Sequence, residues 1–339
     1  MPRLAQGSPV RIAMVGAGEM ANRVHYPSLA SFDDVEFVGI CDIDPERLQS
    51  TADQYGIGSR YADYQRMISE LQPDGIYVIG QPHIMYDLWT WCLQQGQNLF
   101  IEKPMGITRH QARMLAWLAE EHDCITQVGF QRRSSPMVCE LRRQCLARGP
   151  ISHAICKFYK YLPTPFIGAR DHMMDDCVHA IDTVRWMCRG DVVGVESQCR
   201  RIGTPDINDI LATLTFDNGA TGVVINSWTS GKRIFAVEMH APGIFVEAEH
   251  EGSARVYTDG DLEPSVYDAK RFAGSDQLYA YGGFRAKSRE FIEALLGGPL
   301  PSSHFGDALV TMELAEEILA QSLLADQAEA RLGPNGEGR

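Results

Sequence analysis

The chain has 339 residues, 45% of them apolar and 22% charged, and a formal net charge of −13. This length favours two domains over one, and the apolar fraction is sufficient for a sizeable core. The acidic balance argues against nucleic acid and against an anionic membrane surface, because basic patches bind both.

The sequence also lacks the signals of a secreted or membrane protein. No run of eighteen apolar residues occurs, and residues 1–9 have no apolar signal core. The nine cysteines are scattered, without a Cys-x-x-Cys pair. Neither a disulfide framework nor a zinc site is therefore expected. We expect a cytoplasmic protein with reduced thiols that acts on a small molecule.

A glycine-rich turn follows the first predicted strand, residues 11–16. The turn reads G-x-G-x-x-A over residues 16–21, and a helical pattern then runs toward Leu29. In such a turn the first glycine makes the bend, the second admits a pyrophosphate, and the small third residue lets helix and strand pack closely. The helix N-terminus then faces the phosphates. The predicted cofactor contacts here are Gly16, Gly18, Glu19 and Met20.

An aspartate ends the second predicted strand, residues 35–41. Asp42 lies at about the spacing expected for an acid that binds the cofactor's ribose. A carboxylate there accepts hydrogen bonds from the ribose hydroxyls and repels a 2′-phosphate, so NAD is favoured over NADP. Arg23 and Arg47 leave NADP open, because either can serve a phosphate. Asp44, ahead of Pro45, is the better candidate for a helix cap.

Strands continue to alternate with helices as far as residue 130. This alternation predicts a parallel, doubly wound α/β sheet, whose ligands bind at the carboxyl ends of its strands. The further strands are 75–80, 98–101 and 124–130, and the helices are 62–71, 86–95 and 108–122. The residues after two of these strands extend the predicted cofactor site: Gln81, Pro82, His83, Glu102 and Lys103.

The pattern changes after residue 130. A predicted helix at 136–148 is followed by a strand at 151–162 and a loop with Pro163 and Pro165. Six later stretches have strand character, at 191–202, 209–217, 219–229, 232–240, 244–249 and 254–257. Asp217-Asn218-Gly219 predicts a hairpin, so the second sheet should be mostly antiparallel. Two amphipathic helices are predicted at 283–296 and 305–326.

These patterns predict two domains and a tail. Residues 1–130 form a doubly wound dinucleotide-binding domain, and residues 131–326 form a second α/β domain, to which the family resemblance given below assigns substrate binding and oligomer formation. Residues 327–339 are polar and glycine-rich, which predicts a flexible tail.

Residues 175–186 predict a helix with an unusual polar stripe. Residues three and four apart share a helix face, which brings Asp175, His179, Asp182 and Trp186 together. Two carboxylates and an imidazole on one stripe are a candidate proton-handling site. The alternative is a surface helix with acidic residues paired to nearby arginines. Cys177 is expected to be a buried thiol, and Trp186 to be part of the core.

Taken together, these motifs resemble the Gfo/Idh/MocA family of oxidoreductases, over residues 11–324. The resemblance rests on the glycine turn, Asp42, Glu102-Lys103-Pro104, residues 129–133 and Asp175-x-x-x-His179-x-x-Asp182. It implies a Rossmann domain followed by a domain with a large open sheet, through which homodimers or homotetramers form. It also implies NAD(P)-dependent oxidation or reduction of a hydroxyl-bearing carbon on a sugar, a cyclitol or a similar polar molecule.

The resemblance implies a catalytic triad of Lys103, Asp175 and His179. His179 is the candidate base, because its ordinary pKa is near neutral pH. Asp175 can orient its ring, and Lys103 can stabilise a developing alkoxide. In this family the Lys–Pro bond is often cis, which would aim the lysine inward. Asp182 is equally a substrate ligand or a helix anchor, and Tyr159 is a pocket wall or a packing residue.

Several alternatives remain open in the sequence. Arg132 and Arg133 either contact substrate or form structural ion pairs. Cys177 replaces a glycine that is common in the family in a segment that borders the pocket, so the substrate class is not fixed. Tyr86 replaces a histidine that is common in the family; this difference concerns contacts on the cofactor side and does not affect the hydride chemistry. Two other functions are an enzyme that retains NAD and cleaves or eliminates through transient oxidation, and a non-catalytic dinucleotide sensor.

Overall fold

The computed structural model describes residues 8–162 and 171–332. The chain divides into two compact units, one with residues 1–136 and 273–309, the other with residues 137–272 and 310–339. The division differs from the predicted boundary at residue 130, because residues 273–309 belong to the first unit. The reason is α10 (Phe284–Leu295), whose Phe291 and Ile292 are fully buried in the core of that unit.

The first unit is built on a parallel sheet of six strands, in the order β3-β2-β1-β4-β5-β6. This confirms the predicted doubly wound sheet. The strands are β1 (Val10–Val15), β2 (Val35–Cys41), β3 (Arg60–Tyr61), β4 (Gly75–Val78), β5 (Leu99–Ile101) and β6 (Thr126–Val128). The prediction missed β3, because two residues are too short to show a periodic pattern.

Helices join these strands, and local side chains determine where several of them begin. Asp44 accepts hydrogen bonds from the N–H groups of Glu46 and Arg47 and so caps α2, as predicted. Asp63 caps α3 in the same way, and Thr108 caps α5. The helical elements are η1 (Ala21–His25), α1 (Tyr26–Ala30), α2 (Pro45–Tyr55), α3 (Tyr64–Leu71), α4 (Pro82–Gln94), α5 (Arg109–Glu121), η2 (Gln131–Ser134), α9 (Leu278–Tyr281) and α10.

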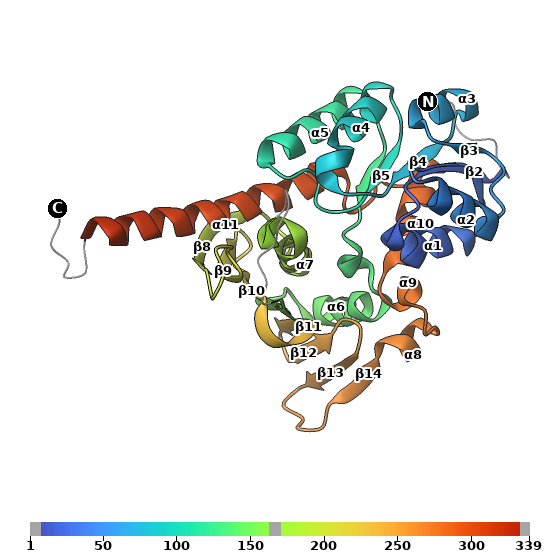
Figure 1. The fold of residues 1–339 in the computed structure, drawn as a ribbon. Helices are drawn as coiled ribbons and strands as arrows, with labels where there is room; N and C mark the ends of the chain where they lie inside the picture. The colour runs from blue at the N-terminus through green and yellow to red at the C-terminus, as the bar shows by residue number, and fades with distance from the viewer. Residues whose placement is uncertain (1–7, 163–170, 333–339) are drawn as a thin grey trace. The chain divides into compact units, whose positions relative to one another are not determined.

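Helices cover both faces of this sheet. On one face α1 and α10 contact each other, and on the other α4 and α5 lie side by side (Figure 1). An aromatic cluster fills the space under α10, where the rings of Tyr77 and Phe100 stack with centroids 4.3 Å apart and Phe291 meets both edge-on. The strands β4 and β5 are therefore packed tightly against α10.

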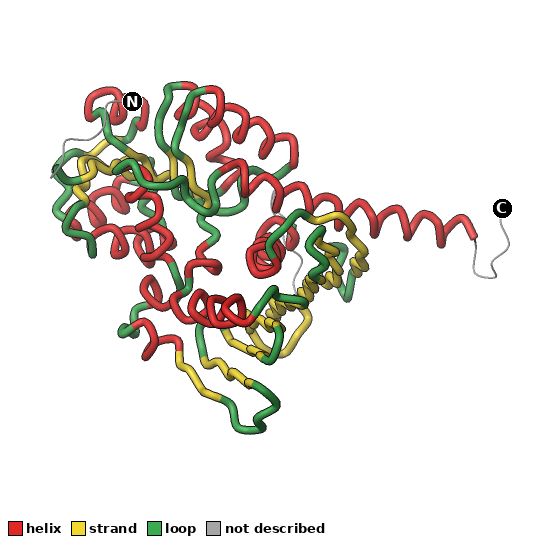
Figure 2. Tube along the Cα trace, turned by 180° about the vertical axis from the view of Figure 1, so that it is seen from behind, coloured by secondary structure: helices red, strands yellow, loops and turns green. Residues whose placement is uncertain are grey.

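The second unit is built on a sheet of eight strands, in the order β14-β13-β12-β11-β7-β10-β9-β8. All neighbours are antiparallel except β7 and β10, which confirms a mostly antiparallel sheet. Figure 2 shows the strands in yellow. Gly219, with φ +85°, completes the predicted turn between β9 and β10. The strands are β7 (His153–Tyr161), β8 (Val192–Arg200), β9 (Asp209–Phe216), β10 (Thr221–Ser227), β11 (Thr229–Ala241), β12 (Ile244–Glu249), β13 (Ser253–Thr258) and β14 (Ser265–Asp268).

Helices pack on one face of this second sheet. α7 (Val178–Cys188) lies against β7 and β10, so closely that a Cβ on Gly222 would be 2.3 Å from the Val184 side chain. α11 (Phe305–Leu332) lies along β8, where the Ser197 hydroxyl donates to the Ile318 carbonyl. The remaining helices are α6 (Pro136–Arg148), with the predicted bounds, η3 (Met173–Cys177) and α8 (Ala269–Ala273).

The C-terminal helix extends further than predicted. Residues 327–332, assigned to a flexible tail, continue α11 as far as Leu332, because this stretch consists largely of good helix formers. Residues 333–339 of that tail, and the loop with Pro163 and Pro165, lie outside the described residues. No helix within the described ranges is long and apolar enough to cross a membrane.

Candidate active site

The glycine turn after β1 has the shape of a phosphate cradle. Gly16 has φ +105°, and a Cβ there would lie 2.1 Å from the carbonyl oxygen of Ile79, so only glycine fits. Gly18, by contrast, borders open space, because no heavy atom lies within 4 Å of the position that a Cβ would take there. The helix that begins at Glu19 follows directly. The turn therefore leaves open space at a helix N-terminus, which fits the pyrophosphate of a dinucleotide.

Asp42 is fixed against this turn. One oxygen of its carboxylate accepts the N–H of Ala17 at 2.6 Å, and the other accepts the N–H of Asp44 at 2.8 Å. The backbone of the turn thus holds the carboxylate at the carboxyl end of β2. This is where a parallel sheet of this kind places the ribose of a bound dinucleotide.

The other predicted cofactor residues differ in exposure. Glu19, Met20, Gln81 and His83 are exposed, whereas Pro82 is buried at the start of α4. The first four side chains are therefore open to a ligand. Pro82 sets the beginning of the helix, since its ring favours the first helical turn.

Lys103 follows the end of β5 and is half-buried. The Lys103–Pro104 peptide bond is cis, as the family resemblance led us to expect. Glu102 is 8% exposed, and its carboxylate is used within the unit. It accepts a hydrogen bond from His25 at 2.8 Å and lies near the N–H of Lys103 at 3.3 Å. The carboxylate of Glu102 thus has protein partners, and its predicted contact with the cofactor stays a prediction.

The sequence did not reveal His25. A histidine nine residues after the first glycine of the turn carries no signal by itself. Its role depends on β5, which is distant in the sequence and meets the helix only in the folded unit.

In the second unit, the predicted α-helix with the polar stripe begins as a π-helix. Residues Met173–Cys177 form η3, in which the N–H of Val178 donates to the carbonyl of Met173, and α7 follows. Asp175 lies in the π-helical turn and is half-exposed, while His179 lies in the first turn of α7 and is 5% exposed. Such wide turns are frequent at functional sites.

Three further residues support this π-helical turn. Lys160 from β7 contacts the buried carboxylate of Asp176, and the indole N–H of Trp228 donates to the same carboxylate at 3.2 Å. His172, which precedes η3, packs on the Trp228 ring with centroids 4.5 Å apart. Burial lowers the pKa of His172, although nearby aspartates oppose this shift. The sequence did not single out Lys160 or Trp228, because only the folded sheet brings them to Asp176.

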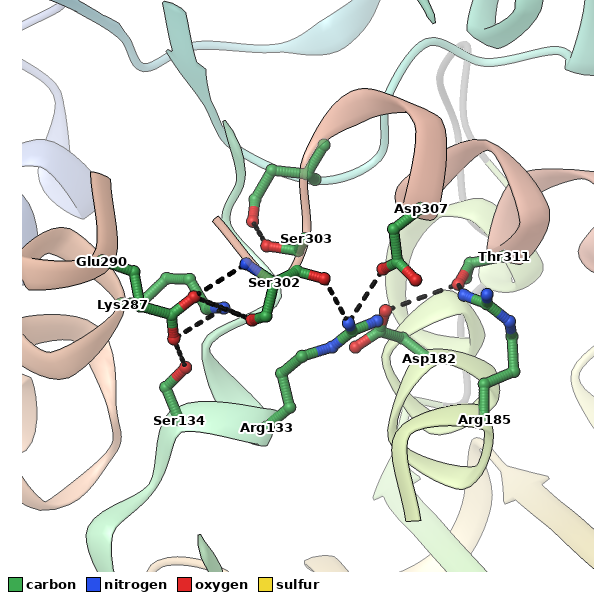
Figure 3. Close-up of polar contacts among 11 residues, drawn as sticks. Arg133, Ser134, Asp182, Arg185, Lys287, Glu290, Ser302, Ser303, Asp307 and Thr311 are labelled. Carbon is green, nitrogen blue, oxygen red and sulfur yellow. Dashed lines mark hydrogen bonds and ion pairs between the residues drawn. The ribbon is translucent and has the colours of Figure 1, made fainter. Parts of the chain in front are cut away.

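Asp182 lies inside the second unit. It is fully buried, and the hydroxyl of Thr311 on α11 donates to its carboxylate at 3.4 Å. Arg185 donates to the same hydroxyl at 2.8 Å (Figure 3). Of the two roles that the sequence left open, these contacts favour the anchor, because they tie α7 to α11.

Tyr159 lies on the face of the sheet opposite that of Lys160. Successive side chains of a strand alternate between faces, and Lys160 reaches Asp176 on the helix-covered face. Tyr159 instead neighbours Lys157, Glu238 and Asp209, and burial raises the pKa of its hydroxyl. Within this unit, the structure does not bring Tyr159 together with Asp175 and His179.

The remaining residues that the sequence singled out have structural partners. The guanidinium of Arg133 pairs with Asp307 at 2.8 Å and donates to the Ser302 carbonyl (Figure 3). Trp186 is half-buried under the guanidinium of Arg142, 4.5 Å from the ring centroid. Complete burial raises the pKa of the Cys177 thiol well above its ordinary value, so this thiol stays protonated, as expected of a core residue.

Comparison with known proteins identifies two family matches. Residues 10–130 match the oxidoreductase family with an NAD-binding Rossmann fold, and residues 149–241 match the GFO/IDH/MocA C-terminal domain. Together the two matches cover most of both sheets. The first of these domains binds a nicotinamide dinucleotide.

Curated relatives and a solved structure agree with these matches. The chain is 31% identical to the D-glucoside 3-dehydrogenase of Escherichia coli over 40% of its own length, and this match spans 39% of that protein. It is 25% identical to the NAD(+) scyllo-inositol 2-dehydrogenase of Bacillus subtilis, over 65% of this chain and 68% of that one. A dehydrogenase structure from Chromobacterium violaceum shares the fold, with a TM-score of 0.86 at 20% identity, over 95% of this chain and 97% of that one.

Proposed function

The chain belongs to the GFO/IDH/MocA family of oxidoreductases, and from this premise we propose that it is an NAD(P)-dependent dehydrogenase or reductase. It transfers a hydride between the nicotinamide and a hydroxyl- or keto-bearing carbon of a sugar-like or cyclitol-like molecule. The observation that carries this proposal is the turn at Gly16 and Gly18, with Asp42 bound to its backbone and Lys103 at the end of β5 of the same sheet.

We propose distinct roles for the three polar residues. The dinucleotide, when bound, supplies the ring carbon that exchanges a hydride with the substrate. In the oxidation direction His179 takes the hydroxyl proton while the carbon–hydrogen bond breaks. Asp175 orients the imidazole and stabilises its charged form. The ammonium group of Lys103 donates a hydrogen bond to the same oxygen as negative charge develops on it.

The substrate class follows from this chemistry and from the relatives. A secondary alcohol with neighbouring hydroxyls offers an oxygen for Lys103 and His179 and further groups for orientation. The relatives named above act on a glucoside and on an inositol. A panel of myo-inositol, scyllo-inositol and methyl glucosides, with NADH absorbance as the readout, tests the proposal. Net NADH formation supports it, and no turnover with any polyol or sugar contradicts it.

NAD is the proposed cofactor, because a 2′-phosphate would meet the carboxylate of Asp42. We expect kcat/KM for NAD to exceed that for NADP by about tenfold or more, since juxtaposed like charges cost several kcal/mol. Asp42→Asn keeps an oxygen that can accept the Ala17 N–H but removes the charge. This variant should lose most of the preference for NAD. Both ratios come from steady-state kinetics, and wild-type protein that uses NADP as well as NAD would contradict the assignment.

We also propose that the chain forms a homodimer or homotetramer through its second sheet. The face opposite α7 carries half-buried apolar side chains, including Ile155, Val223, Ile225 and Ile234. Such a patch is typical of a contact between identical subunits. Ile225→Asp should lower the molar mass measured by light scattering. Leu262→Asp, which adds the same charge at a side chain that is 91% exposed, is the control. A wild-type protein that is monomeric at micromolar concentration would contradict this proposal.

A further inference from the structure

A buried hydrogen bond joins the helix of the glycine turn to the residue before Lys103. His25 ends η1, is 1% exposed, and its Nε2 lies 2.8 Å from Oε1 of Glu102. Glu102 is 8% exposed and directly follows β5. A carboxylate is rarely buried in this way without a specific partner. His25 therefore stabilises a charged group at the end of the strand that carries Lys103.

The surroundings of the imidazole determine which of its nitrogens donates the hydrogen bond to Glu102. Its ring meets Phe100 edge-on with centroids 5.3 Å apart, and Tyr77 and Phe284 lie within about the same distance, at 6.0 Å and 6.1 Å. Among the described residues, its Nδ1 is buried and has no hydrogen-bond partner. An N–H on Nδ1 would be unpaired, which is costly in a core. A proton on Nε2 fits these contacts, because this N–H then donates to Glu102.

The carboxylate of Glu102 is confined on its other sides as well. Its Oε2 lies 3.3 Å from the backbone N of Lys103. Gly129, at the end of β6, leaves room for it, since a Cβ at that position would lie 2.7 Å from Oε1. The N–H of Gly129 also donates to the carbonyl of Ile101 at 2.8 Å. The carboxylate is thus held between His25, the ends of two strands and the backbone of Lys103.

We propose that His25 is a positioning residue for Lys103 and acts through Glu102. This inference rests on the proposed function, in which Lys103 is a catalytic residue. The Nε2–H of His25 fixes the carboxylate of Glu102, and that carboxylate in turn holds the backbone N–H of Lys103 at the end of β5. The pair also links η1, which follows the glycine turn, to the residue before the lysine through one buried contact.

Loss of the imidazole donor should therefore slow the reaction more than it weakens cofactor binding. Without it, the buried carboxylate turns toward another donor, and this change moves the backbone of Lys103. A displacement of about 1 Å in a reacting group can cost about 100-fold in rate. The glycine turn and Asp42 do not depend on this hydrogen bond, since the backbone of the turn forms their contacts.

The test compares two substitutions at one position. His25→Phe keeps an aromatic ring in the cluster and removes the donor, so kcat should fall by about 10- to 100-fold. The Kd for NAD, measured by calorimetry without substrate, should stay within about threefold of the wild-type value. His25→Gln offers an amide N–H near the position of Nε2, and should recover most of kcat. The assay uses the compound from the polyol and sugar panel that gives the fastest NADH formation.

Phe284→Leu is the matched control. It removes a ring that touches His25 but leaves the imidazole and Glu102 in place. This variant should lower the melting temperature and keep wild-type kcat. A merely structural role for His25 predicts instead that His25→Phe resembles Phe284→Leu, with reduced stability and unchanged kcat, and that outcome would overturn the inference.

A third variant separates this inference from the function on which it rests. Lys103→Met should lower kcat by about 100- to 1000-fold whatever His25 does. If Lys103→Met keeps wild-type kcat, the proposed role of the lysine in the reaction fails. If Lys103→Met loses activity to this extent while folded His25→Phe keeps wild-type kcat, only the positioning role of His25 fails. If His25→Phe does not fold, His25→Gln tests the positioning role instead. A folded Gln variant with kcat reduced as far as in Lys103→Met would show that an N–H at this place does not suffice, and would contradict that role.

Discussion

Lys103→Met should lower kcat by about 100- to 1000-fold and leave the affinity for NAD within a few-fold of the wild-type value. The methionine keeps most of the length of the side chain and removes the ammonium group. Loss of one donor to a developing oxyanion typically costs this much. The proposed cofactor contacts lie at Gly16, Gly18 and Asp42, whose contacts do not involve the lysine. Steady-state kinetics and calorimetric titration with NAD provide the two values.

The control for this variant is Lys232→Met. Lys232 pairs with Glu249 on the second sheet, and its side chain is 66% exposed. Removing its charge should change neither kcat nor stability appreciably, because exposed ion pairs contribute little. Turnover by Lys103→Met within twofold of the wild type would show that the lysine takes no part in the chemistry.

The second large effect is expected for His179→Ala. Loss of a general base typically costs about 100- to 10,000-fold in rate. His179 is buried at the first turn of α7, so the alanine leaves a cavity of imidazole size. Added imidazole should therefore restore part of the activity. His110→Ala, at an exposed position on α5, is the control and should behave as the wild type. If circular dichroism shows that the alanine variant is unfolded, the absence of rescue by imidazole says nothing about the base. His179→Gln is then the second variant.

Activity retained in both His179 variants would contradict the assignment of this residue as the base. Lys103 and His179 are proposed to act on one substrate, and residues that act as a unit are not additive. The activity of the double variant should thus be only slightly lower than that of the less active single variant.

The features that could be predicted from the sequence are those set by short stretches of chain. The glycine turn, the Asp44 and Thr108 caps and the hairpin at Gly219 each depend on a few neighbouring residues. Helix α6 even has its predicted bounds, because Pro136 begins it and Gly149-Pro150 ends it. The alternation of strands and helices was enough for the first sheet, apart from the two-residue strand β3.

The features that could not be predicted depend on distant partners. Periodicity does not distinguish an α-helix from the π-helical turn of η3, since the difference is one residue in the backbone hydrogen bonds. Successive side chains of a strand point to opposite faces, so Tyr159 and Lys160 lie on different faces of the sheet. The sequence did not show which of these faces α7 covers. The return of residues 273–309 to the first unit depends on Phe291 and Ile292 entering a core assembled from other segments. The contact of His25 with Glu102 likewise joins segments that are distant in the sequence.

Deuterium transfer is the most direct test of net hydride transfer by this chain. The panel compound with the highest turnover is prepared with deuterium on its carbinol carbon, and the reduced dinucleotide is analysed by mass spectrometry. We predict one deuterium per NADH, NADH in equal amount to the ketone formed, and formation of both products about 100- to 1000-fold more slowly with Lys103→Met. Release of a leaving group or cleavage of the compound without accumulation of NADH would contradict it, and would favour transient oxidation with retained NAD.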